Sequence, residues 1–575
     1  MTAQNDAGPI AGSGALRRGL EAALAGVVLL GTLVLVIAPI GYVFFGALQS
    51  QPPGAPDSVF TFDNILTAYT SPSYLLALFN TLGLATTVAV LSILCGGALA
   101  WIIARTDAPW RRPLALLLVV PLMISTLVTT LAWIALAAPN AGFINALSRA
   151  WFGVRTVFDI YSFAGIVLVH VLHYSAFAFL SFFAALRSID ASLEEASAML
   201  GAGPLRTAWR MTLPLIFPSI ATTFLVIFVF VCENFSVPTL LGTPIGFQTL
   251  PSLIYFNMEI TPAHPTLAAA TGTMLLWVAL LGTLWQRRIA ARANRYVTVA
   301  GKGVRPRVTP LGRWRYVATG FVVLFLTLSV ILPYFALILS SLLNFLTPRI
   351  HLSSLTLDNY RTFFDGDNFT PIKNSLLLAG GGGLLITFIY ILLSYLMLRA
   401  RSSFGALVDY VTIIPTALPA LILGVGMVWT FVGLPLPIYG TMAILLIAYF
   451  VRYIGYGVRH ANNAFSQVST DLVDAARITG ATPLQTLRDI LVPLVRPSIL
   501  SLWTVLFIFI FMEVSATILL YSPHTRTLPT VLWVYMGSGS QTRAFAIAVV
   551  QATLIFAVLF VADRKFGTLK ATLES

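Results

Sequence analysis

Charged residues are scarce in this 575-residue chain, since Asp, Glu, Lys and Arg make up only 10% of it. Hydrophobic residues account for 58%, and the mean hydropathy is +0.88. A chain this apolar cannot bury its nonpolar surface inside one soluble core. The composition therefore excludes an ordinary soluble protein and predicts an integral membrane protein.

Cysteine and histidine are also rare, with 2 and 6 residues. Cys95 and Cys232 fall within long apolar runs, where no oxidising environment would pair them, so neither indicates a disulfide or a metal site. The histidines are dispersed and the 21 acidic residues lie mostly in loops, so the clustered catalytic set of a membrane-embedded enzyme is missing. We expect no catalytic residues in this chain.

The sequence also lacks a phosphate-binding loop of the form Gly, four residues, Gly-Lys-Ser/Thr. Gly301-Lys302-Gly303 supplies only a part of that motif. The run from Gly380 to Gly383 lies within an apolar segment, where small residues favour close helix packing. We therefore expect no cofactor bound by this chain.

Apolar runs of about 20 residues predict twelve membrane-spanning helices, six in each half. The predicted spans of the first half are 22–48, 76–104, 114–138, 161–186, 215–240 and 266–286. Those of the second half are 316–343, 372–398, 407–432, 440–460, 498–521 and 544–563. The predicted fold is an all-α integral membrane protein with an N-terminal half at 1–286, a linker at 287–315 and a C-terminal half at 316–575. The first run is too long for the core of a signal peptide, so we interpret it as a retained helix.

The net charge of +13 would suit nucleic-acid binding, but the positions of the 34 basic residues give another explanation. Arg17 and Arg18 precede the first span and place the N-terminus in the cytoplasm by the positive-inside rule, and twelve crossings return the C-terminus to the same side. On this topology about 27 basic residues are cytoplasmic or at the inner boundary. The outer ones are Arg149, Arg155, Arg349, Arg361, Lys373, Arg526 and Arg543. The basic excess indicates orientation in a lipid bilayer, and we expect no nucleic-acid partner.

The linker at 287–315 concentrates basic residues, glycine and proline. This composition predicts a solvated cytoplasmic segment that is attracted to lipid headgroups.

One segment occurs twice. Residues 195–201, Glu-Ala-Ser-Ala-Met-Leu-Gly, recur 279 positions later as residues 474–480, Asp-Ala-Ala-Arg-Ile-Thr-Gly. The same offset relates Pro204 to Pro483, Leu205 to Leu484, Pro214 to Pro493 and Pro218-Ser219-Ile220 to Pro497-Ser498-Ile499. Six spans are an even number, so both copies lie on one side, and we expect a pseudo-twofold axis along the membrane normal that relates the halves.

The repeat reaches further towards the N-terminus with a different offset. Asn80, Arg105 and Pro121 match Asn374, Arg399 and Pro415 at 294 positions. The first half therefore carries about 15 extra residues, which we expect in the outer loop around 139–161, where added length costs little.

Each copy of the repeated segment lies in a polar loop, near 190–214 and 469–493, that we expect to fold as two short helices around a turn. Ser192 and Glu195 have capping-box spacing, Asp190 offers another cap, and Gly201 ends the first helix. Pro204 opens the second helix.

In the second loop, Thr482 precedes Pro483 and is the expected N-cap of the second helix. Leu484, Leu487 and Leu491 then share one face of that helix. We expect this apolar face to be left for a partner to cover.

The two loops resemble the signature of permease subunits of binding-protein-dependent ABC importers: Glu-Ala-Ala, three residues, Gly, nine residues, an aliphatic residue, one residue, Leu-Pro. The matching residues are Glu195, Ala196, Gly201, Met211 and Leu213-Pro214, then Asp474, Ala475, Ala476, Gly480, Ile490 and Val492-Pro493. Ser197 for Ala and Asp474 for Glu are mild departures, and the spacing is intact twice. The resemblance covers nearly the whole chain.

The resemblance implies a type I ABC importer permease fold in the bacterial cytoplasmic (inner) membrane, with both termini cytoplasmic. It implies that the short helix after each glycine is a coupling helix, that two copies of a separate ATPase subunit dock there with ATP and Mg, and that a periplasmic or extracellular solute-binding protein delivers the solute. The implied ATPase-coupling residues are Glu195, Ala196, Gly201, Pro204, Leu205, Pro214, Asp474, Ala475, Ala476, Gly480, Pro483, Leu484 and Pro493. The alternative class is a secondary transporter, which needs no coupling loops and more often carries an inverted repeat.

Acidic residues inside spans are costly and therefore candidates for function. Glu233 and Glu513 lie at similar places in the fifth span of each half, and with Asn234 they are our candidates for the translocation path. Two carboxylates favour a cation, and hard oxygen ligands suit a ferric ion, so both acids are candidate metal contacts. The alternative is that they bond to neighbouring helices or brace a gate. His170, His173 and Arg452, near the fourth spans, indicate packing or interfacial roles.

The tracts 233–242 and 513–523 resemble the ferric-iron branch of this family, as does the fused twelve-span form. That branch is close to importers of polyamines, thiamine, phosphonates and phosphorylated sugars, and the tracts do not separate them. We expect ferric iron as the solute, with these others as alternatives.

Overall fold

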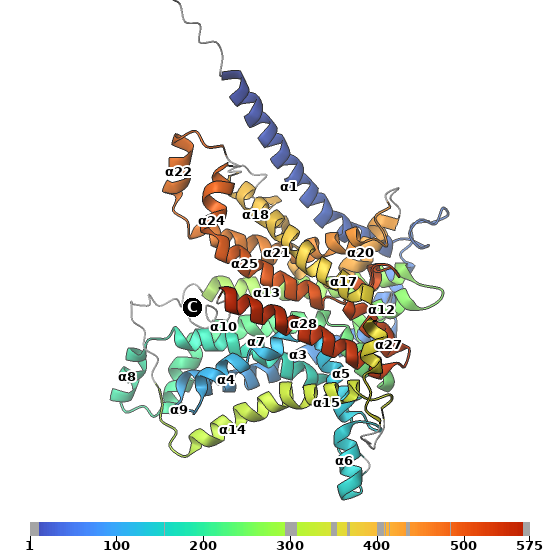
Figure 1. Ribbon diagram of the computed structural model, residues 1–575, viewed down its shortest axis with the longest axis vertical. Helices are drawn as coiled ribbons and strands as arrows, with labels where there is room; N and C mark the ends of the chain where they lie inside the picture. The colour runs from blue at the N-terminus through green and yellow to red at the C-terminus, as the bar shows by residue number, and fades with distance from the viewer. Residues whose placement is uncertain are drawn as a thin grey trace, which may run out of the picture.

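The computed structural model describes residues 11–154, 156–293, 308–346, 354–364, 369–399, 407–408, 410–412, 414–432, 437–482 and 485–566. Within these ranges the chain is helical, and its only β pairing is three isolated bridges. The all-α prediction is confirmed (Figure 1).

The helices follow the two predicted halves. The first half contains α1 (Ala11–Ala47), α2 (Asp63–Thr70), α3 (Pro72–Arg105), α4 (Arg111–Leu117), η1 (Val120–Met123), α5 (Thr126–Ala137), α6 (Phe143–Phe152), α7 (Phe163–Arg187), α8 (Ala191–Met199), α9 (Pro204–Thr207), η2 (Ala208–Thr212), α10 (Leu213–Glu233), α11 (Ser236–Gly242), α12 (Leu250–Glu259) and α13 (Pro265–Ala293). The second half contains α14 (Trp314–Leu326), α15 (Leu332–Ser341), α16 (Asp358–Phe364), α17 (Thr370–Leu376), α18 (Gly383–Arg399), η9 (Ile414–Ala417), α20 (Ala420–Val432), α21 (Met442–Ser466), α22 (Thr470–Ile478), η10 (Thr486–Leu491), α24 (Val492–Leu494), α25 (Arg496–Met512), α26 (Thr517–Leu520), α27 (Leu528–Gly537) and α28 (Gln541–Phe566).

Most predicted spans are confirmed as helices, and the third is corrected. In the described residues, nine helices are long and apolar enough to cross a membrane, and two bent pairs raise the number to eleven. The predicted third span is one of these pairs, since Arg111–Met123 and Thr126–Ala137 meet at 97°. The chain breaks there because Ser125 starts a new helix, its Oγ accepting a hydrogen bond from the Leu127 amide at 3.2 Å. Within the predicted ninth span the structure describes η9 and the short helix α20.

The break recurs in the second half, where η9 and α20 match η1 and α5 at the offset that relates Pro415 to Pro121. Matching hydrogen bonds also recur. The Leu250 amide donates to Thr81 Oγ1 at 2.9 Å, and the equivalent Leu528 amide donates to Ser375 Oγ at 2.8 Å. The two halves therefore repeat the same fold down to individual contacts.

The predicted extra residues of the first half form α6. Asn145 fastens this helix to the bundle, because its Nδ2 donates to the carbonyl oxygens of Ala138 and Phe158 at 3.1 and 2.8 Å. The structure describes no counterpart of α6 in the residues between α20 and α21. The position of the insertion is thus as predicted.

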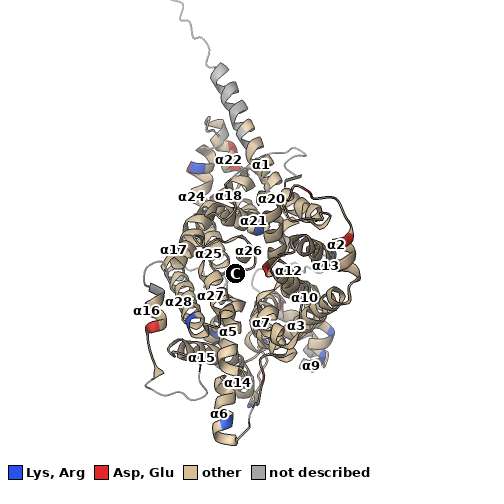
Figure 2. Cartoon of the chain, turned by 90° about the vertical axis from the view of Figure 1, so that its right-hand side faces the viewer, with Lys and Arg blue, Asp and Glu red and all other residues tan. Residues whose placement is uncertain are grey.

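The pseudo-twofold axis passes between Tyr255 on α12 and Trp533 on α27. These residues occupy matching positions in the two halves, and Trp533 Nε1 donates to the Tyr255 hydroxyl at 2.9 Å. Equivalent residues can touch only where the symmetry axis runs between them. Figure 2 shows α12 and α27 close to the centre of the molecule, with the two halves around them.

The first span of each half packs on the opposite half. Helix α1 lies on α20 as well as on α13, and α15 lies on α5 as well as on α28. The approach of α1 is close: a Cβ added to Gly426 would lie 2.3 Å from the Pro39 carbonyl oxygen. Glycine at this position lets the two helices touch.

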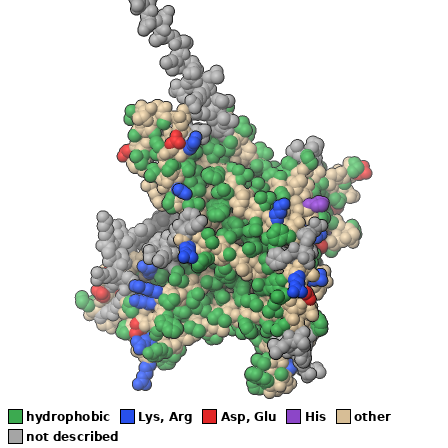
Figure 3. All heavy atoms as spheres, in the orientation of Figure 1, with side chains coloured by type: hydrophobic (Ala, Val, Ile, Leu, Met, Phe, Trp, Pro, Cys, Tyr) green, Lys and Arg blue, Asp and Glu red, His purple; other side chains and the backbone are tan. Residues whose placement is uncertain are grey.

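Most long helices run from left to right in Figure 1, with α1 steeply inclined to them, and α8 and α22 lie at the same, left-hand end. We call this the loop end and the opposite end, with α6, α17 and α27, the far end. In Figure 3 hydrophobic side chains cover the middle of the visible face, while charged side chains gather towards the two ends. This is the surface that a bilayer requires.

Three of the basic residues predicted to be outer, Arg149, Lys373 and Arg543, lie on α6, α17 and the first turn of α28, away from the loop end. Arg155 and Arg349 are outside the described residues. The cytoplasmic position of both termini stays a prediction.

Candidate functional site

The first helices of the two repeated loops begin at matching caps. Asp190 Oδ1 accepts a hydrogen bond from the Ser192 amide at 3.0 Å, and Ser469 Oγ accepts one from the Asp471 amide at 3.2 Å. Ser192 already lies within the first turn of α8. The expected capping box of Ser192 with Glu195 is therefore wrong, and the alternative cap, Asp190, is right.

Both helices end at the predicted glycines. Gly201 and Gly480 have φ of +77° and +82°, a conformation that favours glycine. The Ala202 amide donates to the Ser197 carbonyl at 3.1 Å, and the Ala481 amide donates to the Ala476 carbonyl at 3.0 Å. These bonds span five residues and close a Schellman-type cap in both loops.

Apolar side chains next to these glycines are uncovered. Met199 and Leu200 are 87% and 88% exposed, and Ile478, which matches Met199, is 86% exposed. The residues of the signature differ in burial. Glu195, Ala196, Asp474 and Ala475 are exposed, whereas Ala476 is buried. Each loop thus presents an acidic residue and an apolar tip at the loop end of the bundle.

The second helix of each loop is only partly as predicted. The expected N-cap is confirmed, since Thr482 Oγ1 accepts from the Gln485 amide at 3.3 Å and the Thr482 amide donates to Gln485 Oε1 at 2.8 Å. Leu487 and Leu491, however, are buried against the bundle. For Leu487 and Leu491 the prediction that this face awaits a partner is wrong, because the helix turns them onto its own half.

The connection from each loop to the fifth span of its half contains further residues of the signature. Pro214 and Pro493 stand in the first turn of α10 and α24. Pro483 and Leu484 lie outside the described residues, and only the backbone of Pro204 and Leu205 is described. In the first half Ala208–Glu233 forms one span, whereas Thr486–Leu494 meets Arg496–Met512 at 76°. The two loops are therefore connected differently to their spans.

A buried ion pair, which the sequence did not indicate, braces the first loop. Arg105 is 1% exposed, its Nη1 lies 3.3 Å from Glu194 Oε2, and its Nη2 donates to the Leu186 carbonyl at 2.7 Å. Thr212 Oγ1 donates to Glu194 Oε1 at 3.4 Å. The repeat could not reveal the pair, because Val473 stands where the first half has Glu194.

The end of the linker is attached to the same place. The Thr309 amide donates to the Arg105 carbonyl, and the Leu311 amide donates to Asp107 Oδ1, both at 2.8 Å. A cavity of about 320 Å³ lies between these linker residues and the loop, lined partly by Glu194. The described linker residues from 308 to 313 are exposed or half-buried, as a solvated segment should be, and two of them also hydrogen-bond to the chain at and just after the end of α3. Helix α13 also continues to Ala293, beyond the expected boundary at 286.

Replacing Arg105 with Met is expected to loosen the first loop and leave the second unchanged. Removing one partner of a buried ion pair takes the counter-charge away from the other, at a cost of about 3–5 kcal/mol. Hydrogen exchange of the full chain in lipid should accelerate in α8 and not in α22. Arg361→Met is the matched control, because the Arg361 side chain is 76% exposed beside Asp358. Unchanged exchange in α8 would contradict this role for Arg105.

A second cluster joins the two halves near the centre of the bundle. Arg452 on α21 donates from Nη2 to Glu233 Oε1 at 2.9 Å and from Nη1 to the Leu418 carbonyl at 2.7 Å. Tyr453 donates from its hydroxyl to Glu513 Oε2 at 2.7 Å. We call Glu233, Arg452, Tyr453 and Glu513 the polar junction. It brings both predicted acids into one cluster that contains an arginine.

The predicted pairing of the two acids is off by one residue. Helices α10 and α25 end at Glu233 and Met512, short of the expected ends of their spans, and Asn234 and Glu513 follow them in matching conformations. Asn234 Oδ1 accepts from the Val237 amide at 3.2 Å, as Glu513 Oε1 accepts from the Ala516 amide at 3.1 Å. Glu513 therefore corresponds to Asn234, at the same offset that relates the two repeated loops.

The histidines near the fourth spans occupy packed positions. His170 is fully buried and its Nδ1 lies 2.8 Å from the Ile166 carbonyl oxygen. His173 packs edge-on against Tyr174, with ring centroids 4.9 Å apart. These contacts agree with the predicted packing role.

Neither acid of the polar junction belongs to a larger set of metal ligands. In the described parts of the chain, no three His, Cys, Asp or Glu side chains lie close enough to hold a metal ion. Both carboxylates already accept hydrogen bonds from the protein. The geometry is that of a bonded polar contact between helices, which was the alternative interpretation of these acids.

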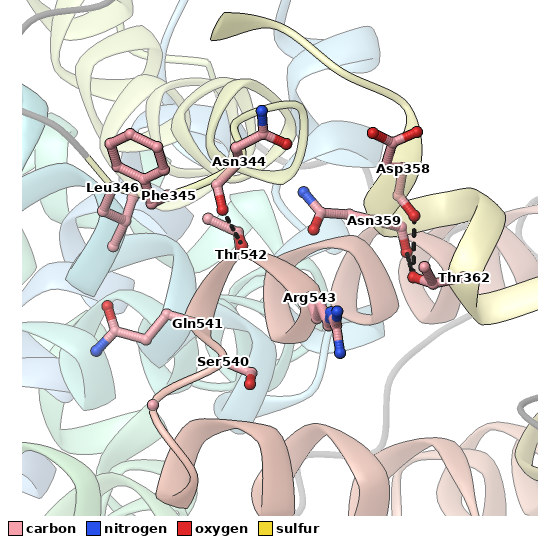
Figure 4. Close-up of a pocket in the computed structure, with 11 residues that line it drawn as sticks. Asn344, Phe345, Leu346, Asp358, Asn359, Thr362, Ser540, Gln541, Thr542 and Arg543 are labelled. Carbon is pink, nitrogen blue, oxygen red and sulfur yellow. Dashed lines mark hydrogen bonds between the residues drawn. The ribbon is translucent and has the colours of Figure 1, made fainter.

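The far end carries a polar hollow in the second half. A cavity of about 400 Å³ lies between the end of α15, the start of α16 and the start of α28 (Figure 4). Asp358, Asn359 and Arg543 line it, and Thr542 Oγ1 donates to the Asn344 carbonyl at 3.3 Å. Asp358 and Arg543, which have opposite charges, are thus exposed at the end opposite the loops.

Comparison with known proteins assigns the family. The model of the binding-protein-dependent transport system inner membrane component matches residues 92–295 and 390–564. The chain belongs to this family. The two matches fall in the two halves, so it contains the family domain twice and is a multi-pass inner-membrane component.

The chain is similar to curated ferric transport permeases. It is 28% identical over 433 residues to the ferric transport system permease protein FbpB of Actinobacillus pleuropneumoniae, covering 74% of this chain and 61% of that protein. A putative ferric transport system permease protein FbpB 1 of Haemophilus influenzae is 28% identical, covering 67% and 61%. The chain therefore spans about three fifths of the length of these relatives.

Similarity also extends to another kind of importer. A putative 2-aminoethylphosphonate transport system permease protein PhnV of Salmonella typhimurium is 26% identical over 151 residues, covering 26% of this chain and 57% of that protein. Among solved structures, a chain of a bacterial ABC transporter involved in the import of alginate matches with a TM-score of 0.39 and 20% identity, covering 49% of this chain and 97% of that one.

Proposed function

We propose that this family member is the membrane-spanning permease of an ATP-driven importer, and that its two halves form the path for a solute that an external binding protein delivers. The observation that supports this most is the pair of exposed loops at one end of the bundle. Each presents an apolar tip, Met199 and Leu200 or Ile478, at a left-handed glycine. Uncovered apolar surface of this kind marks a contact with a partner.

Two copies of an ATPase subunit would cover these tips, one on each loop, and would carry the ATP and Mg. The chain itself has no phosphate-binding loop in its sequence and acts as a non-catalytic transport subunit. When the two ATPases close on each other, they would draw the loops together. Helix α10, which continues from the first loop, would then move and switch access to the path.

Co-purification tests this proposal. The tagged chain, expressed together with its ATPase subunit, is expected to retain two ATPase copies and to hydrolyse ATP in proteoliposomes. Transport by the chain with no ATPase bound would overturn the importer and favour a secondary transporter.

Ferric iron is the solute we propose. It is supported by the relatives, whose names describe ferric transport, and by the polar junction, in which two carboxylates and one guanidinium sum to one negative charge when ionised. A polyamine, thiamine, a phosphonate or a sugar phosphate is the alternative. The far-end hollow beside Asp358 and Arg543 is the surface that we propose for the solute-binding protein.

Replacing Glu513 with Gln is expected to lower uptake of ferric iron about tenfold, which corresponds to about 1.4 kcal/mol. The amide oxygen of Gln can still accept from the Ala516 amide, so the variant removes the charge and keeps the helix cap. Uptake of radiolabelled iron by proteoliposomes measures the effect, and Glu259→Gln, at the end of α12, is the control. If the solute is a phosphonate, Glu513→Gln should leave uptake unchanged or raise it.

A further inference from the structure

The Glu233–Arg452 ion pair joins the two halves across the expected path. Glu233 is the last residue of α10 in the first half, and Arg452 lies within α21 of the second half. The two side chains are 17% and 15% exposed, so the pair is largely withdrawn from solvent. Glu513 and Tyr453 also lie close enough to Arg452 to interact with its charge.

This ion pair exists on one side of the pseudo-twofold axis only. At the offset of the repeated loops, Glu233 corresponds to Met512 and Arg452 corresponds to His173. Methionine carries no charge, so the matching position has no ion pair. The repeated fold is therefore built without this contact on one side, which indicates that packing of the bundle does not require it.

A second contact between the two halves involves Phe235, which comes two residues after Glu233 in the chain. Phe235 packs against Trp533 with ring centroids 4.8 Å apart, and Trp533 also contacts Tyr255 at the axis. Aromatic contacts of this kind stabilise an interface beyond the area that they bury. The ion pair and the aromatic cluster together close the interface between the halves at the level where α10 ends.

Helix α10 connects this closure to the first repeated loop. It begins directly after η2 of that loop and ends at Glu233, 21 residues later. At 1.5 Å per residue this length is about 30 Å, the thickness of the hydrocarbon core of a bilayer. A displacement of the loop by a partner would therefore be transmitted along one helix to the carboxylate.

We propose that Glu233 and Arg452 form a latch that closes the path towards the far end, and that the latch parts before a solute passes between the halves. Its part in transport rests on the proposed function, whereas the latch itself is a property of this chain. Arg452 therefore acts as a positioning residue. It holds the Glu233 carboxylate near the Leu418 carbonyl, at the chain break before α20, and Tyr453 holds the Glu513 carboxylate within the second half.

Cys232 precedes Glu233 in the chain, so the reactivity of its thiol can show whether the latch is closed. This measurement needs neither the ATPase nor the solute-binding protein. Cys232 is 1% exposed beside Glu233, and Cys95→Ala leaves it as the single thiol of the full chain. In proteoliposomes, a charged methanethiosulfonate reagent is expected to modify Cys232 about tenfold faster in Arg452→Glu, which places a third carboxylate in the junction. Arg361→Glu, an exposed arginine at the far end, is expected to leave the rate unchanged.

The exchanged pair, Glu233→Arg with Arg452→Glu, keeps the sum of charges and is expected to restore slow modification. Arg452→Gln, a milder change, covers the case in which Arg452→Glu fails to insert, and it should also accelerate modification. An unchanged rate in Arg452→Gln, or an exchanged pair as reactive as Arg452→Glu, would overturn the latch.

ATP hydrolysis supplies a readout that a merely structural pair would not change. With the ATPase subunits bound and no solute-binding protein, Arg452→Gln is expected to raise ATP hydrolysis. Without the Glu233–Arg452 latch, the interface between the halves would no longer hold the two repeated loops apart. Unchanged hydrolysis in a complex that does form would contradict the link to the loops. If no ATPase binds the wild-type chain, the proposed function fails while the thiol measurement still decides on the latch.

Discussion

Valine at both Gly201 and Gly480 is expected to abolish ATP-driven uptake while the chain still inserts into the membrane. Both glycines have a left-handed φ that costs residues with a Cβ roughly 1–2 kcal/mol. Nothing lies within 4 Å of a Cβ added at either position, so the strain acts on the backbone and not on packing. The turn that aims each second helix would change, and the loops would no longer meet their partners in register.

Gly153→Val is the matched control for this strain. Gly153 follows α6 at the far end, with φ of +69° and open space around it. Uptake by proteoliposomes containing the ATPase and the binding protein measures both variants. The role of the loops is wrong if the double variant transports normally, or if Gly153→Val loses as much uptake.

Gly426→Val is expected to detach α1 from the second half. A Cβ at this position would lie 2.3 Å from the backbone oxygen of Pro39, which cannot move aside as a side chain can. Overpacking a tight contact costs about 1–3 kcal/mol, and more where the obstacle is backbone. The thermal unfolding midpoint in detergent should fall, and hydrogen exchange along α1 should accelerate.

Gly41→Val, on α1 itself, provides the comparison. A Cβ at Gly41 meets nothing within 4 Å, so the same substitution adds the same atoms without a collision. Its unfolding midpoint should match that of the wild-type chain. Equal losses in the two variants would mean that valine in these helices, and not the approach of Pro39, causes the effect.

The repeat made much of this fold predictable. Constant offsets placed the two loops, their glycines and the insertion that became α6, because homologous halves fold alike. The break at Ser125 was missed, since an apolar run with proline scores as one span although the chain turns by 97°. The signal was present: a proline recurs there at the repeat offset, as Pro121 and Pro415.

The candidate site was less predictable, because its decisive contacts join distant parts of the chain. Glu233 and Arg452 are 219 residues apart and belong to different halves, so no local spacing relates them. The burial of Leu487 and Leu491 had the same cause, since a helical face does not reveal what covers it. Keeping strictly to the offset of the repeated loops would have identified Asn234 as the counterpart of Glu513.

The packing of the first span of each half on the opposite half has a consequence for biosynthesis. Helix α1 ends at residue 47, and its partner α20 begins at residue 420. At a synthesis rate of about 5–20 residues per second, α1 waits roughly 20–75 s for that partner. The surface around Pro39 and Val43, which meets Gly426 of α20, lacks that cover in the meantime. Lipid tails are as apolar as these side chains, so the delay is harmless in a bilayer, whereas in water the same face would aggregate.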